Sequence, residues 1–113
     1  MLVVEDDRVT SQALRILLSR QNCEVTLAET VSAARAVLRE SQPDYLILDL
    51  MLPDGDGGEI LRELRLTSST VKVIVTTAIN DQQRMADVKA MNPHKFVRKP
   101  FDVVDLLKAM GIM

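Results

Sequence analysis

The sequence is poor in cysteine and in aromatic residues, and it contains no long hydrophobic run. Cys23 is the only cysteine among 113 residues, so an internal disulfide is impossible. No apolar stretch approaches the roughly 18 residues that span a bilayer, and acidic residues stand at the N-terminus where a signal peptide would carry its apolar segment. These absences argue against secretion and membrane insertion, and they predict a cytoplasmic protein.

Other absences concern domain organisation and nucleotide binding. No repeat, low-complexity run or Pro/Gly/Ser-rich linker marks an internal boundary, so we expect a single domain over residues 1–113. The chain has no Gly-rich loop with a GK[ST] motif, which excludes a P-loop nucleotide hydrolase. Its hydrophobic fraction of 47% and charged fraction of 27% are ordinary for a compact globular domain.

The net charge of −2 conceals an asymmetry between the two halves of the chain. Residues 1–60 carry 11 acidic residues against five arginines, a balance of −6, whereas residues 61–113 carry five acidic against nine basic residues, a balance of +4. A cation site is therefore expected in the first half. The basic excess of the second half is modest and lacks interleaved aromatic residues, so nucleic-acid binding by this domain is not expected.

Five short apolar runs alternate with stretches of helical period. The runs are Leu2–Val4, Val25–Ala28, Tyr45–Leu48, Val71–Thr76 and Phe96–Val97. Their length and β-branched content are typical of strands buried on both faces. Alternating strands and helices imply right-handed crossovers and a parallel sheet. We therefore predict an α/β protein, a doubly wound (βα)5 three-layer sandwich with a five-stranded parallel sheet in the flavodoxin-like order 2-1-3-4-5.

Five helices are predicted from apolar residues that recur on one face, and this pattern is weakest in the fourth helix, over residues 82–90. The predicted faces are Val9, Ala13, Ile16 and Leu17; Val31, Ala34, Val37 and Leu38; Ile60, Leu61 and Leu64; Met85 and Val88; and Val103, Leu106, Leu107 and Met110. We expect Asp7 to cap the first helix and Thr30 or Ser32 to cap the second, which Pro43 prevents from continuing.

Polar residues follow the predicted strands at their carboxyl ends, where ligands bind in sheets of this kind. They are Glu5, Asp6 and Asp7, then Asp49, then Thr76 and Thr77, and finally Lys99. Carboxylates that meet at one edge would repel one another and raise their own pKa values unless a cation or a lysine is present. A hard divalent ion such as Mg²⁺, which takes one or two carboxylates together with a phosphate group, fits this requirement.

Asp49 is the best candidate for a nucleophile that forms an aspartyl phosphate. It ends the central apolar run and is followed by residues 51–57, which we expect to form a loop. Thr77 could donate its hydroxyl to one phosphoryl oxygen, and Lys99 could form an ion pair with another. Since Thr76 and Thr77 would face opposite sides of a strand, only one of them can enter the site.

The sequence resembles the receiver domains of bacterial response regulators over essentially its whole length. The matching pieces are Leu2–Asp7, Asp49–Pro53, Gly57, Thr77–Ala78 and Lys99–Phe101, and their set in this order is far more specific than any one piece. The resemblance implies that Glu5 and Asp6 are the acidic pair and that Asp49 is the phosphorylation site. It also implies that the backbone carbonyl of Met51 completes the protein ligands to Mg²⁺.

The resemblance further implies a conformational switch. In receivers a hydroxyl residue moves toward the phosphate and an aromatic residue on the last strand rotates inward; by position these are Thr77, preferred over Thr76, and Phe96. Phe96 is also compatible with ordinary core packing. The switched surface would comprise the fourth helix, the fifth strand and the fifth helix. The peptide bond between Lys99 and Pro100 is expected to be cis.

The function implied is that of a phosphoacceptor receiver in a two-component phosphorelay. A sensor histidine kinase or a histidine phosphotransfer protein would supply the phosphoryl group, and an output domain or partner protein would receive the signal. The domain would catalyse its own phosphorylation and slow dephosphorylation without being an enzyme otherwise. Two alternatives stay open: an aspartate-nucleophile phosphohydrolase, which usually has an acid where this chain has Met51, and a degenerate receiver that serves as a scaffold.

Two departures from the common receiver pattern are visible. Met51 and Ile79, two residues beyond Asp49 and Thr77, are apolar and cannot orient a water, so slow self-dephosphorylation is expected. Residues 91–95 stand where many receivers have a Gly-Ala pair. This departure is compatible with a fourth helix that is shorter or differently tilted, and it therefore concerns the output face. The identity of the kinase, the signal, the output and the oligomeric state are not determined, and a longer regulator and a stand-alone receiver are both compatible with the sequence.

Overall fold

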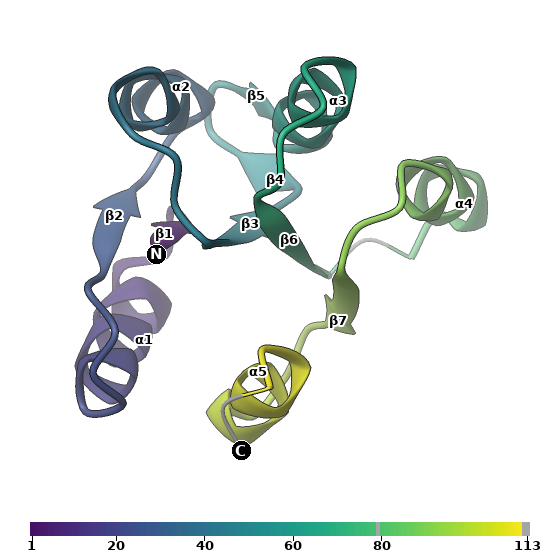
Figure 1. Ribbon diagram of the computed structural model, residues 1–113. Coiled ribbons are helices and arrows are strands. Elements are labelled where there is room, and N and C mark those ends of the chain that lie inside the picture. The colour runs from purple at the N-terminus through teal and green to yellow at the C-terminus, as the bar shows by residue number, and fades with distance from the viewer. Residues whose placement is uncertain (79, 112–113) are drawn as a thin grey trace.

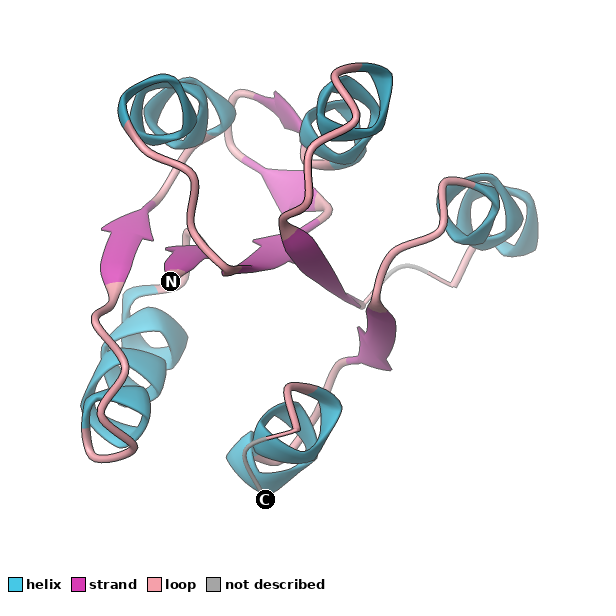
Figure 2. Ribbon diagram, in the orientation of Figure 1, coloured by secondary structure: helices cyan, strands magenta, loops and turns pink. Residues whose placement is uncertain are grey.

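The computed structural model describes residues 1–78 and 80–111. It forms a five-stranded parallel sheet with helices on both faces (Figures 1 and 2). The elements are β1 (Leu2–Val4), α1 (Arg8–Ser19), β2 (Thr26–Ala28), α2 (Val31–Glu40), β3 (Tyr45–Asp49), β4 (Met51–Leu52), β5 (Gly55–Asp56), α3 (Gly58–Leu66), β6 (Lys72–Thr77), α4 (Gln82–Ala90), β7 (Lys95–Arg98) and α5 (Val103–Ala109). The strand order is β2-β1-β3-β6-β7. Since β4 and β5 lie outside this sheet, the predicted order 2-1-3-4-5 is confirmed.

The central strands are buried on both faces and divide the apolar residues into two clusters. Leu46 and Leu48 of β3 pack with α2, α3 and α4, whereas Ile47 packs with α1 and α5. This division follows from the alternation of side chains along a strand. Figure 1 shows the same three layers, with α2, α3 and α4 on one side of the sheet and α1 and α5 on the other.

The apolar face predicted for α1 is wrong. The helix buries Ser11, Leu14 and Leu18, whereas Val9 and Ile16 of the predicted face are 80% and 51% exposed. Apolar residues with helical spacing occur on more than one side of α1, so periodicity could not select the side that meets the sheet. The faces predicted for the other four helices agree with the residues that the structure buries or half-buries.

The predicted helix caps are confirmed. Asp7 caps α1, where its carboxylate accepts a hydrogen bond from the N–H of Val9 at 3.2 Å. Thr30, rather than Ser32, caps α2 with its side chain, and the helix ends before Pro43. These caps fix where α1 and α2 begin, shortly after β1 and β2.

The sequence led us to expect a simple loop over residues 51–57, and this expectation is wrong. It contains an antiparallel hairpin in which Met51 pairs with Asp56 and Leu52 with Gly55. The hairpin lies apart from the main sheet, beside α2 and α3 (Figure 1). Below, residues 51–56 are called the β4–β5 turn.

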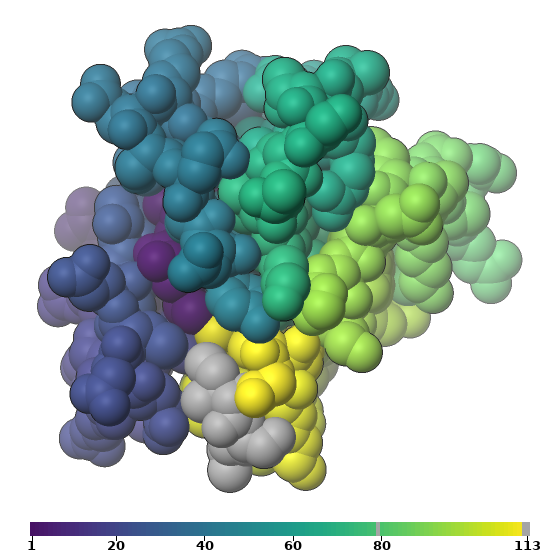
Figure 3. All heavy atoms as spheres, viewed as in Figure 1, coloured from purple at the N-terminus to yellow at the C-terminus, as the bar shows by residue number. Residues whose placement is uncertain are grey.

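Helices α2 and α3 lie side by side on the surface (Figure 3). Arg35 of α2 joins them, because its guanidinium lies 2.6 Å from a carboxylate oxygen of Glu63 and 3.4 Å from one of Glu59, both on α3. In the described part of the chain, no helix has the length and apolar character needed to cross a membrane.

Leu48→Ala should lower the free energy of unfolding by about 2–5 kcal/mol, because the substitution leaves a cavity in a fully buried position. Leu66→Ala is the matched control, since Leu66 is 78% exposed, and it should cost less than about 0.5 kcal/mol. Urea denaturation of the two variants measures both values. Equal losses would contradict the assignment of the core.

Candidate functional site

The carboxyl ends of β1, β3 and β7 bring Glu5, Asp49 and Lys99 into contact. The Lys99 Nζ lies 2.5 Å from Glu5 Oε1 and 2.9 Å from Asp49 Oδ2. Glu5 and Asp49 are only 3% and 4% exposed, so both carboxylates are largely removed from water. Lys99 is 94 residues from Glu5 along the chain and 50 from Asp49. The parallel sheet therefore assembles this cluster from residues that the sequence placed at strand ends.

The pKa values in this cluster reflect a balance between burial and ion pairing. Burial is the largest influence on Glu5 and raises the pKa of its carboxyl from 4.5 to about 7; Lys99 opposes this rise, and Asp49 adds to it. Burial tends to lower the pKa of the Lys99 ammonium, but hydrogen bonds to Glu5 and Asp49 outweigh burial, so this pKa is raised. The single positive charge of Lys99 thus does not fully balance two buried carboxylates.

Asp6 adds a third carboxylate beside this pair. One oxygen from each of Glu5, Asp6 and Asp49 lies within 4.8 Å of the others. Asp6 is exposed, so the cluster is open to solvent on one side. Three carboxylate oxygens at this separation are a donor set that suits a hard divalent cation such as Mg²⁺. Asp7 does not belong to this set, because its carboxylate caps α1.

The backbone of Met51 adjoins the candidate nucleophile. The Met51 N–H donates a hydrogen bond to Asp49 Oδ1 at 3.1 Å, while the other oxygen, Oδ2, accepts from Lys99. Both Asp49 oxygens are therefore oriented by the chain itself. The Met51 side chain is 58% exposed. That the Met51 carbonyl binds a metal stays a prediction, and Ile79, the second apolar residue noted near the site, lies outside the described residues.

Gly57 lies directly against the backbone behind Asp49. A β-carbon at position 57 would stand 2.1 Å from the carbonyl oxygen of Asp49 and 3.2 Å from the Cα of Leu50. The Gly57 N–H also donates to the carbonyl of Leu50 at 2.9 Å. Since these neighbours are backbone atoms that cannot swing aside, only glycine fits without displacing the end of β3.

The end of β6 completes this edge of the sheet. Thr76 and Thr77 are both buried. Thr76 is the register partner of Asp49, and the carbonyl of Thr77 accepts the N–H of Lys99 at 2.8 Å. Thr77 is thus next to Lys99 along the edge, and its selection over Thr76 continues to rest on the family pattern. The Lys99–Pro100 peptide bond is cis, as expected.

Comparison of the sequence with known families shows which family the chain belongs to. A family model described as the response regulator receiver domain matches residues 1–111. The chain belongs to the response regulator receiver domain family. It is therefore a receiver domain of the kind found in two-component signalling systems. Receiver domains generally bind Mg²⁺ at an acidic pocket, and this chain has an acidic cluster formed by Glu5, Asp6 and Asp49.

Curated relatives of this receiver are whole response regulators. Response regulator MprA of Mycobacterium avium (strain 104) is 36% identical over 111 residues, which are 97% of this chain and 48% of that protein. Response regulator MprA of Mycobacterium sp. (strain KMS) is 35% identical with the same coverage. The chain spans about half the length of the curated relatives that it matches.

Solved receiver structures confirm the fold. The non-phosphorylated HemR receiver domain from Leptospira biflexa is similar with a TM-score of 0.89 at 27% identity, over 97% of this chain and 89% of that chain. A CheY-like response regulator receiver domain protein from Methanospirillum hungatei JF-1 reaches a TM-score of 0.91 at 23% identity, over 97% and 88% of the two chains. The predicted flavodoxin-like receiver fold is thus confirmed.

Phe96 of this receiver packs beneath α4. It is half-buried against the cluster on that face, is the register partner of Val75, and lies 5.4 Å from the Nζ of Lys89 on α4, measured to the ring centroid. The core-packing interpretation of Phe96 therefore holds, and its role as a switch residue stays a prediction. His94, just before β7, is exposed.

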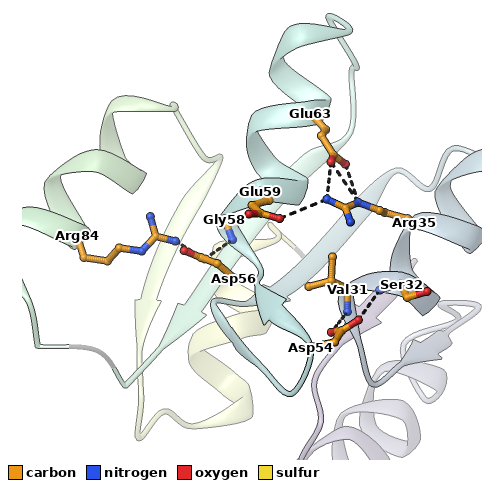
Figure 4. Close-up of polar contacts among 9 residues, drawn as sticks. All are labelled: Val31, Ser32, Arg35, Asp54, Asp56, Gly58, Glu59, Glu63 and Arg84. Atoms are coloured by element: carbon orange, nitrogen blue, oxygen red, sulfur yellow. Dashed lines mark hydrogen bonds and ion pairs between the residues drawn. The ribbon is translucent and has the colours of Figure 1, made fainter.

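The sequence did not identify three charged residues that tie the receiver's β4–β5 turn to its surroundings. Asp54 accepts hydrogen bonds from the first residues of α2, and Asp56 forms an ion pair with Arg84 of α4 (Figure 4). Acidic residues in a loop can cap a helix that is distant in sequence, but no fixed spacing shows which helix they reach. The two aspartates in a short Gly-containing segment were the only available signal.

In the absence of divalent cations, the free energy of unfolding of the Glu5→Gln variant should fall less with rising pH than that of the parent. The folded-state pKa of about 7 lies above the unfolded value of 4.5, so the folded chain keeps a proton that the unfolded chain releases between these values. The stability of the parent should therefore fall, relative to Glu5→Gln, as the pH rises through this window.

Urea denaturation in EDTA at about pH 5 and about pH 8 measures this difference. Glu40→Gln removes the same type of charge at an exposed position and should behave like the parent. An identical pH dependence in the parent and in Glu5→Gln would contradict the raised pKa.

Proposed function

We propose that Asp49 of this receiver accepts a phosphoryl group from a phosphohistidine on a sensor histidine kinase or a histidine phosphotransfer protein, with Mg²⁺ as the cofactor. The observation that carries the proposal is the contact of one lysine, Lys99, with two buried carboxylates, Glu5 and Asp49, at the carboxyl edge of the sheet. Such a partner would place the domain in the cytoplasm.

The chemistry is a transfer between nitrogen and oxygen. A carboxylate oxygen of Asp49 attacks phosphorus, the bond from phosphorus to the imidazole nitrogen breaks, and the imidazole leaves with that electron pair and takes up a proton. Glu5, Asp6, Asp49 and the backbone carbonyl of Met51 would hold Mg²⁺, which when bound stabilises negative charge on the phosphoryl oxygens. Asp49 is already oriented by the N–H of Met51.

Lys99 and Thr77 would convert this metal site into a switch. The Lys99 ammonium, now paired with Asp49, would pair with a phosphoryl oxygen, and the hydroxyl of Thr77 would donate to another. Both residues would then gain contacts that exist only in the phosphorylated state, which biases a two-state equilibrium.

The switched surface would be formed by α4, β7 and α5, and it would act on an output domain or a partner protein. Two observations support this part of the proposal. Val88 is the one residue of α4 that is fully buried, so few apolar contacts oppose a shift of this helix. Phe96 lies beneath α4, where an inward rotation would change the packing of Lys89 and its neighbours.

The receiver would catalyse its own phosphorylation and dephosphorylation and no reaction of other substrates. Met51 occupies the position where an aspartate-nucleophile phosphohydrolase usually has its general acid, and a thioether cannot donate a proton. The contacts among Glu5, Asp49 and Lys99 support an active receiver over a degenerate scaffold.

Incubation with a small phosphodonor and Mg²⁺ should add one phosphoryl group to the parent chain, as seen by intact mass. Asp49→Asn should abolish the adduct, because the amide cannot act as the nucleophile. Asp44→Asn makes the same change at an exposed aspartate outside the cluster and should leave the adduct intact. Rapid turnover of a phosphoester would support the hydrolase instead, and absence of any adduct would support the scaffold.

The phosphorylated parent should lose its phosphoryl group slowly, and Met51→Asn should shorten its lifetime several-fold. The Met51 side chain is exposed beside Asp49 but offers no group that can orient an attacking water, whereas an amide could do so. The decay of the intact-mass adduct measures both lifetimes. A short lifetime in the parent would refute this expectation.

A further inference from the structure

The β4–β5 turn carries Met51 to the side of Asp49, yet it has little apolar support. Its strands contain two residues each, and Met51, Pro53 and Asp54 are exposed. Leu52 is the residue of the turn that packs against a core cluster. Polar contacts must therefore set where the backbone of the turn lies relative to Asp49.

Two of these contacts join Asp54 to the N-terminus of α2. Asp54 Oδ1 accepts the N–H of Val31 at 2.7 Å, and Oδ2 accepts the N–H of Ser32 at 3.0 Å (Figure 4). N–H groups in the first turn of a helix have no partner within the helix and lie at its positive end. These two bonds hold the pKa of Asp54 below its ordinary value. Because both oxygens are used, the turn is fixed in position and in orientation.

A second aspartate holds the other end of the turn. Asp56 Oδ1 accepts the N–H of Gly58 at 2.8 Å at the start of α3 and forms an ion pair with Arg84 of α4 (Figure 4). A β-carbon at Gly58 would stand 2.5 Å from Nη2 of Arg84, so the glycine leaves room for this guanidinium. The turn is therefore held between α2 on one side and α3 and α4 on the other.

We infer that Asp54 is a positioning residue for the cation site: by fixing the β4–β5 turn on the N-terminus of α2, it holds the backbone of Met51 against Asp49. Asp54 is not one of the three carboxylates of the cluster, so it acts through the turn. The effect on metal binding rests on the proposed function, in which the Met51 carbonyl is a ligand. The effect on the Met51 N–H, which already bonds to Asp49, does not depend on a metal.

Asp54→Ala and Thr30→Ala form a matched pair that separates positioning from helix capping. Thr30 accepts the N–H of Ala33 at 3.0 Å, so each substitution removes a side-chain acceptor from the first turn of α2. Asp54 belongs to the β4–β5 turn, whereas Thr30 does not. Asp54→Asn can retain one of the two bonds and should give an intermediate result.

Two readouts are compared in the full chain: the affinity for Mg²⁺, by calorimetric titration, and the hydrogen exchange of the Met51 amide, by NMR in EDTA. Asp54→Ala should weaken Mg²⁺ binding by roughly tenfold, as loss of an outer-shell partner typically does, and should accelerate exchange at Met51. Thr30→Ala should lower the unfolding midpoint to a similar degree and leave both readouts at the parent's values.

Unchanged exchange at Met51 in Asp54→Ala, or equal changes in Thr30→Ala, would overturn the inference. A parent chain that binds no Mg²⁺ would overturn the proposed function together with the metal part of the inference. The exchange of the Met51 amide would then still decide whether Asp54 positions the turn, so the two failures are distinguishable.

Discussion

The ammonium of Lys99 lies between two buried carboxylates, and the arrangement of the site depends on this contact. The parallel sheet places the ends of β1 and β3 next to each other, so Glu5 and Asp49 cannot avoid sharing one poorly hydrated region. Lys99 arrives from the end of β7 and stabilises the pair, but its single charge leaves the pKa of Glu5 raised to about 7. A region that is short of positive charge and lined with oxygen donors favours a divalent cation.

The chain around Asp49 is held more firmly than the helix that would transmit the signal. Asp49 is bounded by the N–H of Met51 on one side and by the backbone of Gly57 on the other. In contrast, Val88 is the one fully buried residue of α4, and polar contacts also join the helix to its neighbours; Arg65 of α3 donates to the carbonyls of Met91 and Asn92, directly after α4. Polar contacts can be exchanged at lower cost than a packed core can be rearranged, which suits a helix that must move.

The sheet and the site cluster could be predicted from the sequence because each rests on a local signal. The β-branched runs identified the strands, and the polar residues that follow them had to meet at one edge, as Glu5, Asp49 and Lys99 do. The buried side of α1 could not be predicted, because its apolar residues fit more than one face, and Leu14 and Leu18 are selected only by the shape of the sheet. The hairpin of the β4–β5 turn was also missed, since two-residue strands carry no periodic pattern.

The polar ties of the turn were beyond sequence reasoning for a related reason. The bonds from Val31 and Ser32 to Asp54 join residues 23 and 22 positions apart, and their pairing depends on where the sheet places α2. A charged residue in a loop has many equally plausible partners until the fold selects one. The family pattern identified Gly57, but the reason for it, the backbone of Asp49 at 2.1 Å from any β-carbon, is visible only in three dimensions.

The central claim is that the buried carboxylates beside Lys99 form a cation site whose charge is not yet balanced. Calorimetric titration of Mg²⁺ at about pH 6.5, in two buffers that differ in ionisation enthalpy, tests it most directly because metal binding to a protonated ligand releases protons. Since the pKa of Glu5 is about 7, binding of one Mg²⁺ should release a fraction of a proton, and Asp49→Asn should weaken the binding. Absence of Mg²⁺ binding, or binding without proton release and without effect of Asp49→Asn, would contradict the account.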